Sequence, residues 1–362
     1  MQSYPVATIN LAALKHNLSR IKQLAPDSKI MSVIKANAYG HGVIEVAQAL
    51  SEVDAFAVAR LTEGIRLRDA GVTKRIVLLE GVHTDLEIQA ASRYGLSPVF
   101  HHADQIALLT KSRMVKPLDF CWLMLETGMH RLGLEKDAFK HAYDQLKSSE
   151  NSTEKLGLMS HFANSDHIGD HRNKAQLEQV IHMANAYQLP ISLANSAAVL
   201  SMPESHTEWL RPGLMLYGIS PFADIPGREL GLKPVMKLSA RLISIQQLQE
   251  GDQVGYGGDW QASTAMTVGT VNIGYGDGYK RHLSNNSQVE INGKIVDVLG
   301  RVSMDMICID LRQLQNVQVG QEVVLWGSDQ LPVEHIAQKA NTIPYELVCQ
   351  ISSRVTRQYI NG

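Results

Sequence analysis

The chain has 362 residues, of which 44% are hydrophobic and 19% charged, and its 34 basic and 36 acidic side chains give a formal charge of −2. This length is too great for one typical domain and suits two, and the composition is that of an ordinary globular protein. The nearly balanced charge argues against a nucleic-acid partner, and no apolar run approaches the ~20 residues that span a bilayer, so we expect no membrane partner either.

The amino-terminal stretch MQSYPVATIN has no basic segment and no long apolar run, so we expect no signal peptide. The three cysteines, Cys121, Cys308 and Cys349, are far apart and lie in apolar segments. Isolated cysteines in an odd number are typical of reduced, mostly buried thiols, which predicts a cytoplasmic protein.

The first predicted elements are a short strand over 5–9 and an amphipathic helix over 11–24 with Asn10 as its N-cap. Strand-like segments and helical patterns then alternate. Eight strands are predicted, over 30–34, 54–59, 75–80, 96–100, 118–125, 156–161, 190–194 and 209–216. The helical patterns between them include 43–50, 62–70, 85–94, 103–111, 137–147 and 174–187.

Alternation of strands and helices predicts parallel strands joined by right-handed crossovers. Eight such units in about 200 residues predict a closed (β/α)8 barrel of the TIM type. The alternative is an open, doubly wound sheet. No G-x-G-x-x-G sequence follows the first strand, which weakens the dinucleotide-binding version of that alternative.

The pattern changes after Gly231, where helical periodicity becomes scarce and β-rich segments are separated by turn sequences such as Asn292-Gly293. One late helix is predicted over 333–340. We therefore predict an α/β barrel domain over residues 1–231 and a mainly β domain over 232–362. The stretch before Leu11 could pack with the second domain.

Polar residues follow several of the barrel strands, which is where such barrels carry their active sites. Lys35 follows the first strand, Arg131 lies in the loop after the fifth, His161 ends the sixth, and Arg211 lies in the eighth. Burial disfavours an ammonium group, and a neutral lysine amine is suited to forming a Schiff base. A lysine that simply extends from a strand end towards solvent would occupy the same position.

The loops after the last two strands of such barrels often bind phosphate through backbone amides, and Ser196 and Gly213 occupy these loops. An amine nucleophile beside a phosphate site suggests pyridoxal 5′-phosphate, which carries both an aldehyde and a phosphate. A metal site at His161, His167 and His171 is not predicted, because their spacing matches no standard zinc pattern and no cysteine is close in sequence.

Five stretches in chain order carry a resemblance to a known family: VIKANAYGHG, ETGMHRLG, RPGLMLYG, GYGDGY and GRVSMDM. Together they resemble the bacterial alanine racemases, pyridoxal phosphate enzymes of fold type III, over essentially the whole chain. The resemblance implies an isomerase that interconverts L- and D-alanine by a two-base mechanism and supplies D-alanine for peptidoglycan synthesis in a bacterial cytoplasm. It also implies a homodimer whose active sites are shared between the subunits.

The resemblance further assigns roles to residues of this chain. Lys35 would carry the cofactor and act as one acid/base, and Tyr275 would be the other. Arg131 and Met304 would bind the substrate carboxylate, with Tyr275 and Met304 reaching the site from the second subunit. The cofactor contacts implied in addition are Tyr39, His161, Ser196, Arg211, Gly213, Leu214 and Tyr345.

Two of these roles have a clear chemical reason. Racemisation removes a proton from one face of the substrate and returns one to the other, so it needs two groups on opposite faces. Arg211 would face the pyridine nitrogen, and a guanidinium cannot readily hand that nitrogen a proton. We infer that this weakens the ring as an electron sink and limits side reactions such as transamination.

One position departs from the family pattern. Many members carry a carbamylated lysine seven residues before the arginine of T-G-M-x-R-L-G, and this chain has Met124 there. Glu126 also replaces a more usual aspartate. We expect Arg131 to be oriented by another anion, such as a chloride ion or a neighbouring carboxylate.

Three alternative functions remain open from the sequence. A broad-specificity amino-acid racemase would share all of these motifs. A decarboxylase of fold type III would normally place a carboxylate at the ring nitrogen, where Arg211 argues against it. A non-catalytic carrier of pyridoxal phosphate would be a barrel alone, and the β domain with Tyr275 argues against that.

Overall fold

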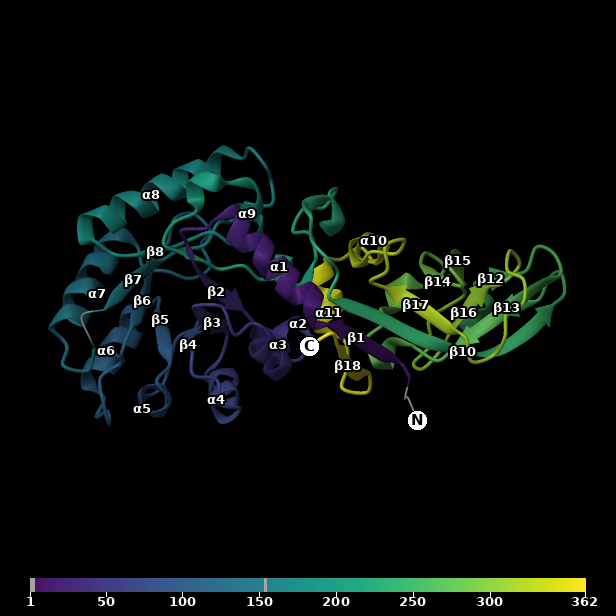
Figure 1. Cartoon of the computed structure of the whole chain (residues 1–362), viewed down its shortest axis with the longest axis horizontal. Helices are drawn as coiled ribbons and strands as arrows, with labels where there is room; N and C mark the ends of the chain where they lie inside the picture. The colour runs from purple at the N-terminus through teal and green to yellow at the C-terminus, as the bar shows by residue number, and fades with distance from the viewer. Residues whose placement is uncertain (1–3, 153–154) are drawn as a thin grey trace.

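The computed structural model describes residues 4–152 and 155–362, and its two parts lie at opposite ends of an elongated molecule (Figure 1). One part is a closed barrel of eight parallel strands, which confirms the predicted (β/α)8 fold. In order around the barrel the strands are β2 (Lys29–Val33), β3 (Ala55–Val58), β4 (Arg75–Leu78), β5 (Ser97–Phe100), β6 (Cys121–Met124), β7 (Leu156–Met159), β8 (Ile191–Ser192) and β9 (Trp209–Leu210).

The barrel closes where β9 pairs with β2, with Trp209 opposite Lys29 and Leu210 opposite Ile30. The strands are short and almost wholly buried, as expected for a parallel sheet covered by helices. The last predicted strand, 209–216, is too long. Pro212 and Gly213 end the extended segment, and Leu214–Tyr217 form a 3₁₀ turn instead.

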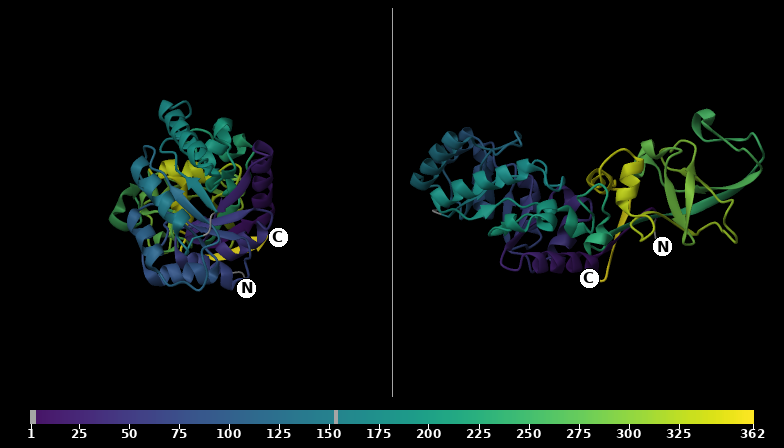
Figure 2. Two further views of the ribbon diagram at one scale, coloured as in Figure 1. Left: turned by 90° about the vertical axis from the view of Figure 1, so that its left-hand side faces the viewer. Right: turned by 90° about the horizontal axis from the view of Figure 1, so that it is seen from above.

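Helices surround the barrel (Figure 2). They are α1 (Leu11–Leu24), α3 (Val43–Ala49), α4 (Leu61–Asp69), α5 (Asp85–Tyr94), α6 (Ala103–Lys111), α7 (Lys136–Ser148), α8 (His171–Tyr187) and α9 (Ser196–Ser201). The Asn10 side chain accepts hydrogen bonds from the amides of Ala12 and Ala13, each at 3.1 Å, so it is the N-cap of α1 as predicted. Helix α8 begins before the predicted Lys174, because Asp170 caps it by accepting from the Arg172 amide at 2.9 Å.

The second part is built on an eight-stranded sheet in the order β13-β16-β15-β14-β17-β10-β1-β18. Its strands are β1 (Val6–Asn10), β10 (Met236–Leu248), β13 (Met266–Val271), β14 (Gln288–Ile291), β15 (Lys294–Leu299), β16 (Ile307–Asp310), β17 (Glu322–Trp326) and β18 (Thr356–Ile360). A two-stranded ribbon of β11 (Gln253–Val254) and β12 (Trp260–Gln261) and two helices, α10 (Val333–Lys339) and α11 (Pro344–Cys349), complete it.

The first strand of the chain belongs to this second sheet. β1 pairs antiparallel with β10 and parallel with β18, so the first and last strands lie side by side next to the junction of the two parts (Figure 1). A hydrophobic core extends from the barrel strands into β10, β17 and α11 without interruption. The domain boundary at residues 231 and 232 stays a prediction. None of the helices in the described part of the chain is long and apolar enough to cross a membrane.

Candidate active site

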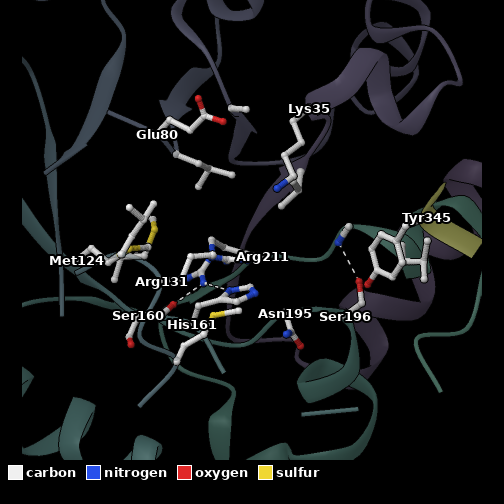
Figure 3. A pocket seen from close by; sticks show the side chains of 18 of the residues that line it. Lys35, Glu80, Met124, Arg131, Ser160, His161, Asn195, Ser196, Arg211 and Tyr345 are labelled. Carbon is white, nitrogen blue, oxygen red and sulfur yellow. Dashed lines mark hydrogen bonds between the residues drawn. The ribbon is translucent and has the colours of Figure 1, made fainter. Parts of the chain in front are cut away.

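A cavity of about 570 Å³ opens where the barrel strands end (Figure 3). It is lined by residues from the segments that follow seven of the eight strands, all except β5, and by α11 of the β-rich part. The predicted site residues that it brings together are Lys35, Tyr39, Arg131, His161, Ser196, Arg211, Gly213, Leu214 and Tyr345.

Two predicted site residues do not line this cavity. Tyr275 and Met304 lie together in the β-rich part, where the Tyr275 amide donates to the Ser303 carbonyl at 3.0 Å and the Gly276 amide donates to the Met304 carbonyl at 2.9 Å. Their side chains are 44% and 51% exposed, respectively. The single chain therefore presents these two side chains on its surface and not at its own cavity.

Lys35 points its amine into the cavity, towards Arg131 and Arg211 (Figure 3). Burial lowers the pKa of this amine, and the positive charge of Arg131 lowers it further. Glu80 and Glu63 act in the opposite direction, because their carboxylates favour the charged form. The net effect is an amine that gives up its proton more easily than a lysine in water.

The backbone after Lys35 differs from the loop that the sequence predicts. Strand β2 ends at Val33, and α2 (Lys35–Tyr39) contains Ala36, Asn37 and Ala38 in the left-handed region, with φ of 52°, 55° and 54°. Such residues cost roughly 1–2 kcal/mol each, so the turn needs support from its surroundings.

Two side chains, one of them fully buried, supply this support. Glu63 accepts the Ala36 amide at 2.7 Å, and its other carboxylate oxygen accepts the Ala59 amide at 2.9 Å. The fully buried His41 ring donates from Nδ1 to the Tyr39 carbonyl at 2.8 Å, and burial lowers the pKa of His41 to about 4, so the ring is neutral. Together they fix the turn that positions Lys35.

An anion cradle lies at the opposite side of the cavity from Arg131. The Ser196 hydroxyl accepts hydrogen bonds from the amides of Gly213 at 2.9 Å and Met215 at 3.3 Å. A Cβ at Gly213 would lie 2.6 Å from the Tyr39 hydroxyl, so only glycine leaves room there. Burial raises the pKa of Tyr39 and raises that of Tyr345 to about 12, so both phenols keep the proton that they can donate to an anion.

Tyr345 reaches the barrel cavity because α11 packs closely against α2. Gly40, which ends α2 with φ of 81°, would place a Cβ only 2.0 Å from the Val348 carbonyl oxygen. A glycine at this position therefore allows α11 to approach, and the rings of Tyr39 and Tyr345 come to 5.8 Å between centroids.

Arg211 is only 4% exposed and is held by neutral acceptors. Its guanidinium donates to the Ser192 and Ser160 carbonyls, to the Ser192 hydroxyl at 2.9 Å, and to His161 Nδ1 at 3.1 Å. Burial and the charge of Arg131 lower the pKa of Arg211 to about 9, which leaves it protonated at neutral pH. No carboxylate within residues 4–152 and 155–362 forms an ion pair with it.

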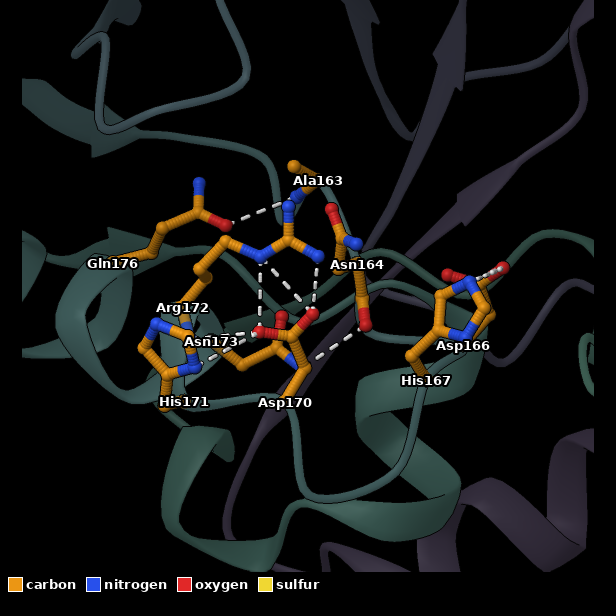
Figure 4. A network of polar contacts seen from close by, with 9 residues as sticks. All are labelled: Ala163, Asn164, Asp166, His167, Asp170, His171, Arg172, Asn173 and Gln176. Atoms are coloured by element: carbon orange, nitrogen blue, oxygen red, sulfur yellow. Dashed lines mark hydrogen bonds and ion pairs between the residues drawn. The ribbon is translucent and has the colours of Figure 1, made fainter.

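His161 is a neutral imidazole. Enclosure of its ring lowers its pKa well below the usual range, and the charges of Arg211, Arg131 and Lys35 act in the same direction. A guanidinium can only donate, so Nδ1 of His161 is the acceptor and its proton resides on Nε2. His167 and His171, by contrast, are exposed and lie beside Asp166 and Asp170 (Figure 4).

Arg131 is exposed at the rim of the cavity, in the loop after β6. Glu126 is not its partner, because that carboxylate accepts the amides of Gly128 and His130. Among the described residues Arg131 makes no ion pair with a carboxylate, and Met124 lines the cavity where a lysine was expected from the family pattern. That another anion orients Arg131 stays a prediction.

Three residues that matter for this geometry were missed from the sequence: Glu63, His41 and Gln176. None follows a barrel strand directly. Gln176 of α8 is a polar residue on a buried helix face, at 3% exposure, and this signal could have found it; Glu63 and His41 offered no such signal.

Comparison with known proteins gives a consistent result along the whole chain. The family model described as the alanine racemase N-terminal domain matches residues 9–221, and that of the C-terminal domain matches residues 235–359. The alanine racemase of Nitrosococcus oceani is 47% identical, covering 98% of this chain and 99% of its own, and that of Coxiella burnetii is 44% identical, covering 96% and 97%.

Solved structures agree with these sequence matches. The biosynthetic alanine racemase from Pseudomonas aeruginosa superposes with a TM-score of 0.93 at 41% identity, covering 99% of each chain. The alanine racemase from Acinetobacter baumannii superposes with a TM-score of 0.91 at 40% identity, covering 99% of this chain and 100% of that one.

Proposed function

Since this chain belongs to the alanine racemase family, we propose that it works with pyridoxal 5′-phosphate bound in the barrel cavity and with a second copy of the chain that completes the site. It is an isomerase that interconverts L- and D-alanine. The proposal extends to a role in supplying D-alanine for peptidoglycan in a bacterial cytoplasm.

The charge of the cavity carries the proposal about the cofactor. Lys35, Arg131 and Arg211 all reach one cavity, and none of the three is paired with a carboxylate in the described part of the chain. Cationic groups held close together favour an anionic ligand. A phosphate and a substrate carboxylate would supply the missing negative charge at two different places.

The residues present fit pyridoxal phosphate. Ser196, the backbone near Gly213 and Leu214, and the phenols of Tyr39 and Tyr345 would hold the phosphate through hydrogen bonds. Lys35 would bind the cofactor through its amine, and Arg211 would face the ring nitrogen. When bound, the cofactor withdraws electrons from the substrate Cα and so makes the Cα–H bond more acidic.

Two groups would then move the protons. The Lys35 Nζ, with its lowered pKa, would accept or give the α-proton on one face of the substrate. The partner subunit's Tyr275 would give or accept the proton on the other face through its phenolic oxygen. One proton leaves and one returns, so the composition of alanine is unchanged and only its configuration is inverted.

The remaining residues orient these groups. Arg131 would bind the substrate carboxylate, with help from the backbone of Met304. Arg211, which is held by the carbonyls of Ser160 and Ser192, would face the pyridine nitrogen of the cofactor and leave it unprotonated. His161 would present its Nε2–H to the second acid/base, because its Nδ1 is occupied by Arg211.

The exposure of Tyr275, Met304 and Met306 supports the second copy of the chain. All three side chains are more than two-fifths exposed, at 44%, 51% and 44%, and they belong to the β-rich part and do not line the cavity. Apolar side chains grouped on a surface mark interaction sites. A symmetric dimer would place each β-rich part over the barrel of the other subunit.

A paired measurement on the purified protein tests the proposal. An absorption band typical of a lysine-bound pyridoxal, lost on borohydride treatment, together with D-alanine formed from L-alanine, is the expected result. D-alanine formed by protein that neither carries nor takes up pyridoxal phosphate would refute the cofactor. The band without D-alanine would contradict the two-base assignment and favour a decarboxylase or a carrier.

A further inference from the structure

The segment that carries His161 is tied to helix α8 by a buried glutamine (Figure 4). Gln176 is 3% exposed, and its Oε1 accepts the Ala163 amide at 3.0 Å. Its Nε2 donates to the His161 carbonyl at 3.0 Å and to the Thr127 hydroxyl at 3.0 Å. One side chain thus uses both of its amide hydrogens and its oxygen, and fixes the backbone on each side of Phe162.

Thr127 begins the loop that carries Arg131, so Gln176 joins two loops. The Thr127 hydroxyl lies 2.8 Å from the Ser160 hydroxyl, and the Ser160 hydroxyl donates to the Leu125 carbonyl at 2.8 Å. Since Ser160 uses its hydrogen on Leu125, Thr127 must donate to Ser160 and accept from Gln176. The hydrogen bonds therefore run in one direction, from Gln176 through Thr127 and Ser160 to the end of β6.

The same network reaches Arg211. The Ser160 carbonyl accepts from the Arg211 guanidinium, which also donates to His161 Nδ1 at 3.1 Å. Hydrogen bonds of this kind are strong in a buried setting, and a buried donor or acceptor left without a partner is costly. A shift of the backbone at Ser160 or His161 is therefore coupled, through Thr127, to the segment that leads to Arg131.

We propose that Gln176 is a positioning residue that couples the His161 segment (residues 160–165) to the Arg131 loop (residues 126–133). Through this coupling it sets the distance from Arg131, which would bind the substrate carboxylate, to Arg211 and His161. The proposal rests on the function proposed above for His161, Arg131 and Arg211. Gln176 itself does not line the cavity, so it acts only through Thr127 and His161.

The test replaces Gln176 by a side chain of similar length that cannot hydrogen-bond, Gln176→Met. We expect faster hydrogen–deuterium exchange in both segments, 160–165 and 126–133. We also expect KM for alanine to rise about fivefold, the cost of roughly one hydrogen bond, with kcat changed less than about twofold.

Asn173 offers a matched control on the same helix. Its side chain is also buried, at 3% exposure, and donates to the Asn164 carbonyl at 3.0 Å, whereas neither His161 nor Thr127 is its hydrogen-bond partner among the described residues. Asn173→Leu should increase exchange around residue 164 and leave both the 126–133 segment and KM unchanged. Equal effects of the two substitutions would mean that Gln176 only stabilises the loop, and would overturn the proposal.

A second pair of variants applies if Gln176→Met does not fold. Thr127→Val keeps the shape and removes the hydroxyl, while Thr127→Ser keeps the hydroxyl. We expect Thr127→Val to increase exchange in residues 160–165 and Thr127→Ser to leave it unchanged. No change in Thr127→Val would overturn the coupling. Exchange is measured without turnover, so this result is independent of whether the wild type forms D-alanine, which tests the proposed function alone.

Discussion

Two inactive variants of this chain should restore activity to each other. Lys35→Ala removes the cavity amine, and Tyr275→Phe removes a phenol that lies in the β-rich part, outside the cavity of its own chain. If each site takes Lys35 from one subunit and Tyr275 from the other, a mixed dimer has one site with both residues and one site with neither. Activity then returns without any new contact.

The size of the effect follows from pairing alone. Random exchange between equal amounts of the two variants makes half of the dimers mixed, and each mixed dimer has one complete site of two. About one quarter of wild-type activity is therefore expected in the mixture, and about one half in mixed dimers isolated with two affinity tags. Each parent variant should retain about 1% or less, because general acid–base groups contribute 10²- to 10⁴-fold. The assay is formation of D-alanine from L-alanine.

A reversed pairing provides the control. A chain that carries both substitutions is paired with the wild type, and in this mixed dimer every shared site lacks one of the two residues. Such dimers should be inactive. The shared site would be refuted by the opposite pattern. In that case the dimer of wild type with the double variant would have half of the wild-type activity, and the dimer of Lys35→Ala with Tyr275→Phe would have none, because both residues would act within one chain.

Three further changes have defined outcomes. Arg131→Ala should lower kcat/KM by at least about tenfold, mainly through a higher KM, because a charge-assisted hydrogen bond to the substrate carboxylate is lost. The control is Arg172→Ala, which removes an exposed arginine paired with Asp170 and should leave the steady-state kinetics unchanged. In the unfolded protein the His41 imidazole binds a proton below its ordinary pKa of 6.5, but in the folded protein it does so only below about 4. The free energy of unfolding that the neutral His41 contributes at pH 7 is therefore lost as the pH falls from about 6.5 to about 4. Denaturant titration should show the difference in unfolding free energy between wild type and His41→Leu shrinking by about 3 kcal/mol from pH 7 to pH 4, and a constant difference would contradict a neutral buried His41. Arg211→Glu should increase the pyruvate formed by transamination, measured with lactate dehydrogenase and NADH, and an unchanged pyruvate rate would argue against the electronic role of Arg211.

The barrel could be predicted from the sequence because its strands are short apolar runs separated by amphipathic helices. The position of Lys35 beside the first strand followed from the same pattern. The left-handed turn after Lys35 could not be predicted, because alanine and tyrosine disfavour that conformation. It depends on Glu63, which is 27 residues away from Ala36 in the sequence and close only in the fold.

The residues of the site could be predicted from the sequence only in part. Arg131, His161, Ser196 and Arg211 follow barrel strands, so their convergence at one end of the barrel is a consequence of parallel topology. Tyr345 was assigned only through the family resemblance, because nothing in its own segment indicates that α11 packs on α2. Gln176 was missed for a similar reason, since its partners belong to loops after two different strands.

The cluster of charges explains how one cavity can hold both an anion site and a nucleophilic amine. Crowded cations raise the free energy of every protonated form, and the group with the lowest intrinsic pKa loses its proton first. Burial lowers the pKa of Lys35 and the charge of Arg131 lowers it further, whereas Arg211, with a pKa of about 9, stays protonated at neutral pH. The Arg131 guanidinium that we propose to bind the substrate carboxylate thus adds to the effect of burial in preparing the amine. Glu80 and Glu63 limit this effect, so that Lys35 can still take up the proton that racemisation requires it to hold.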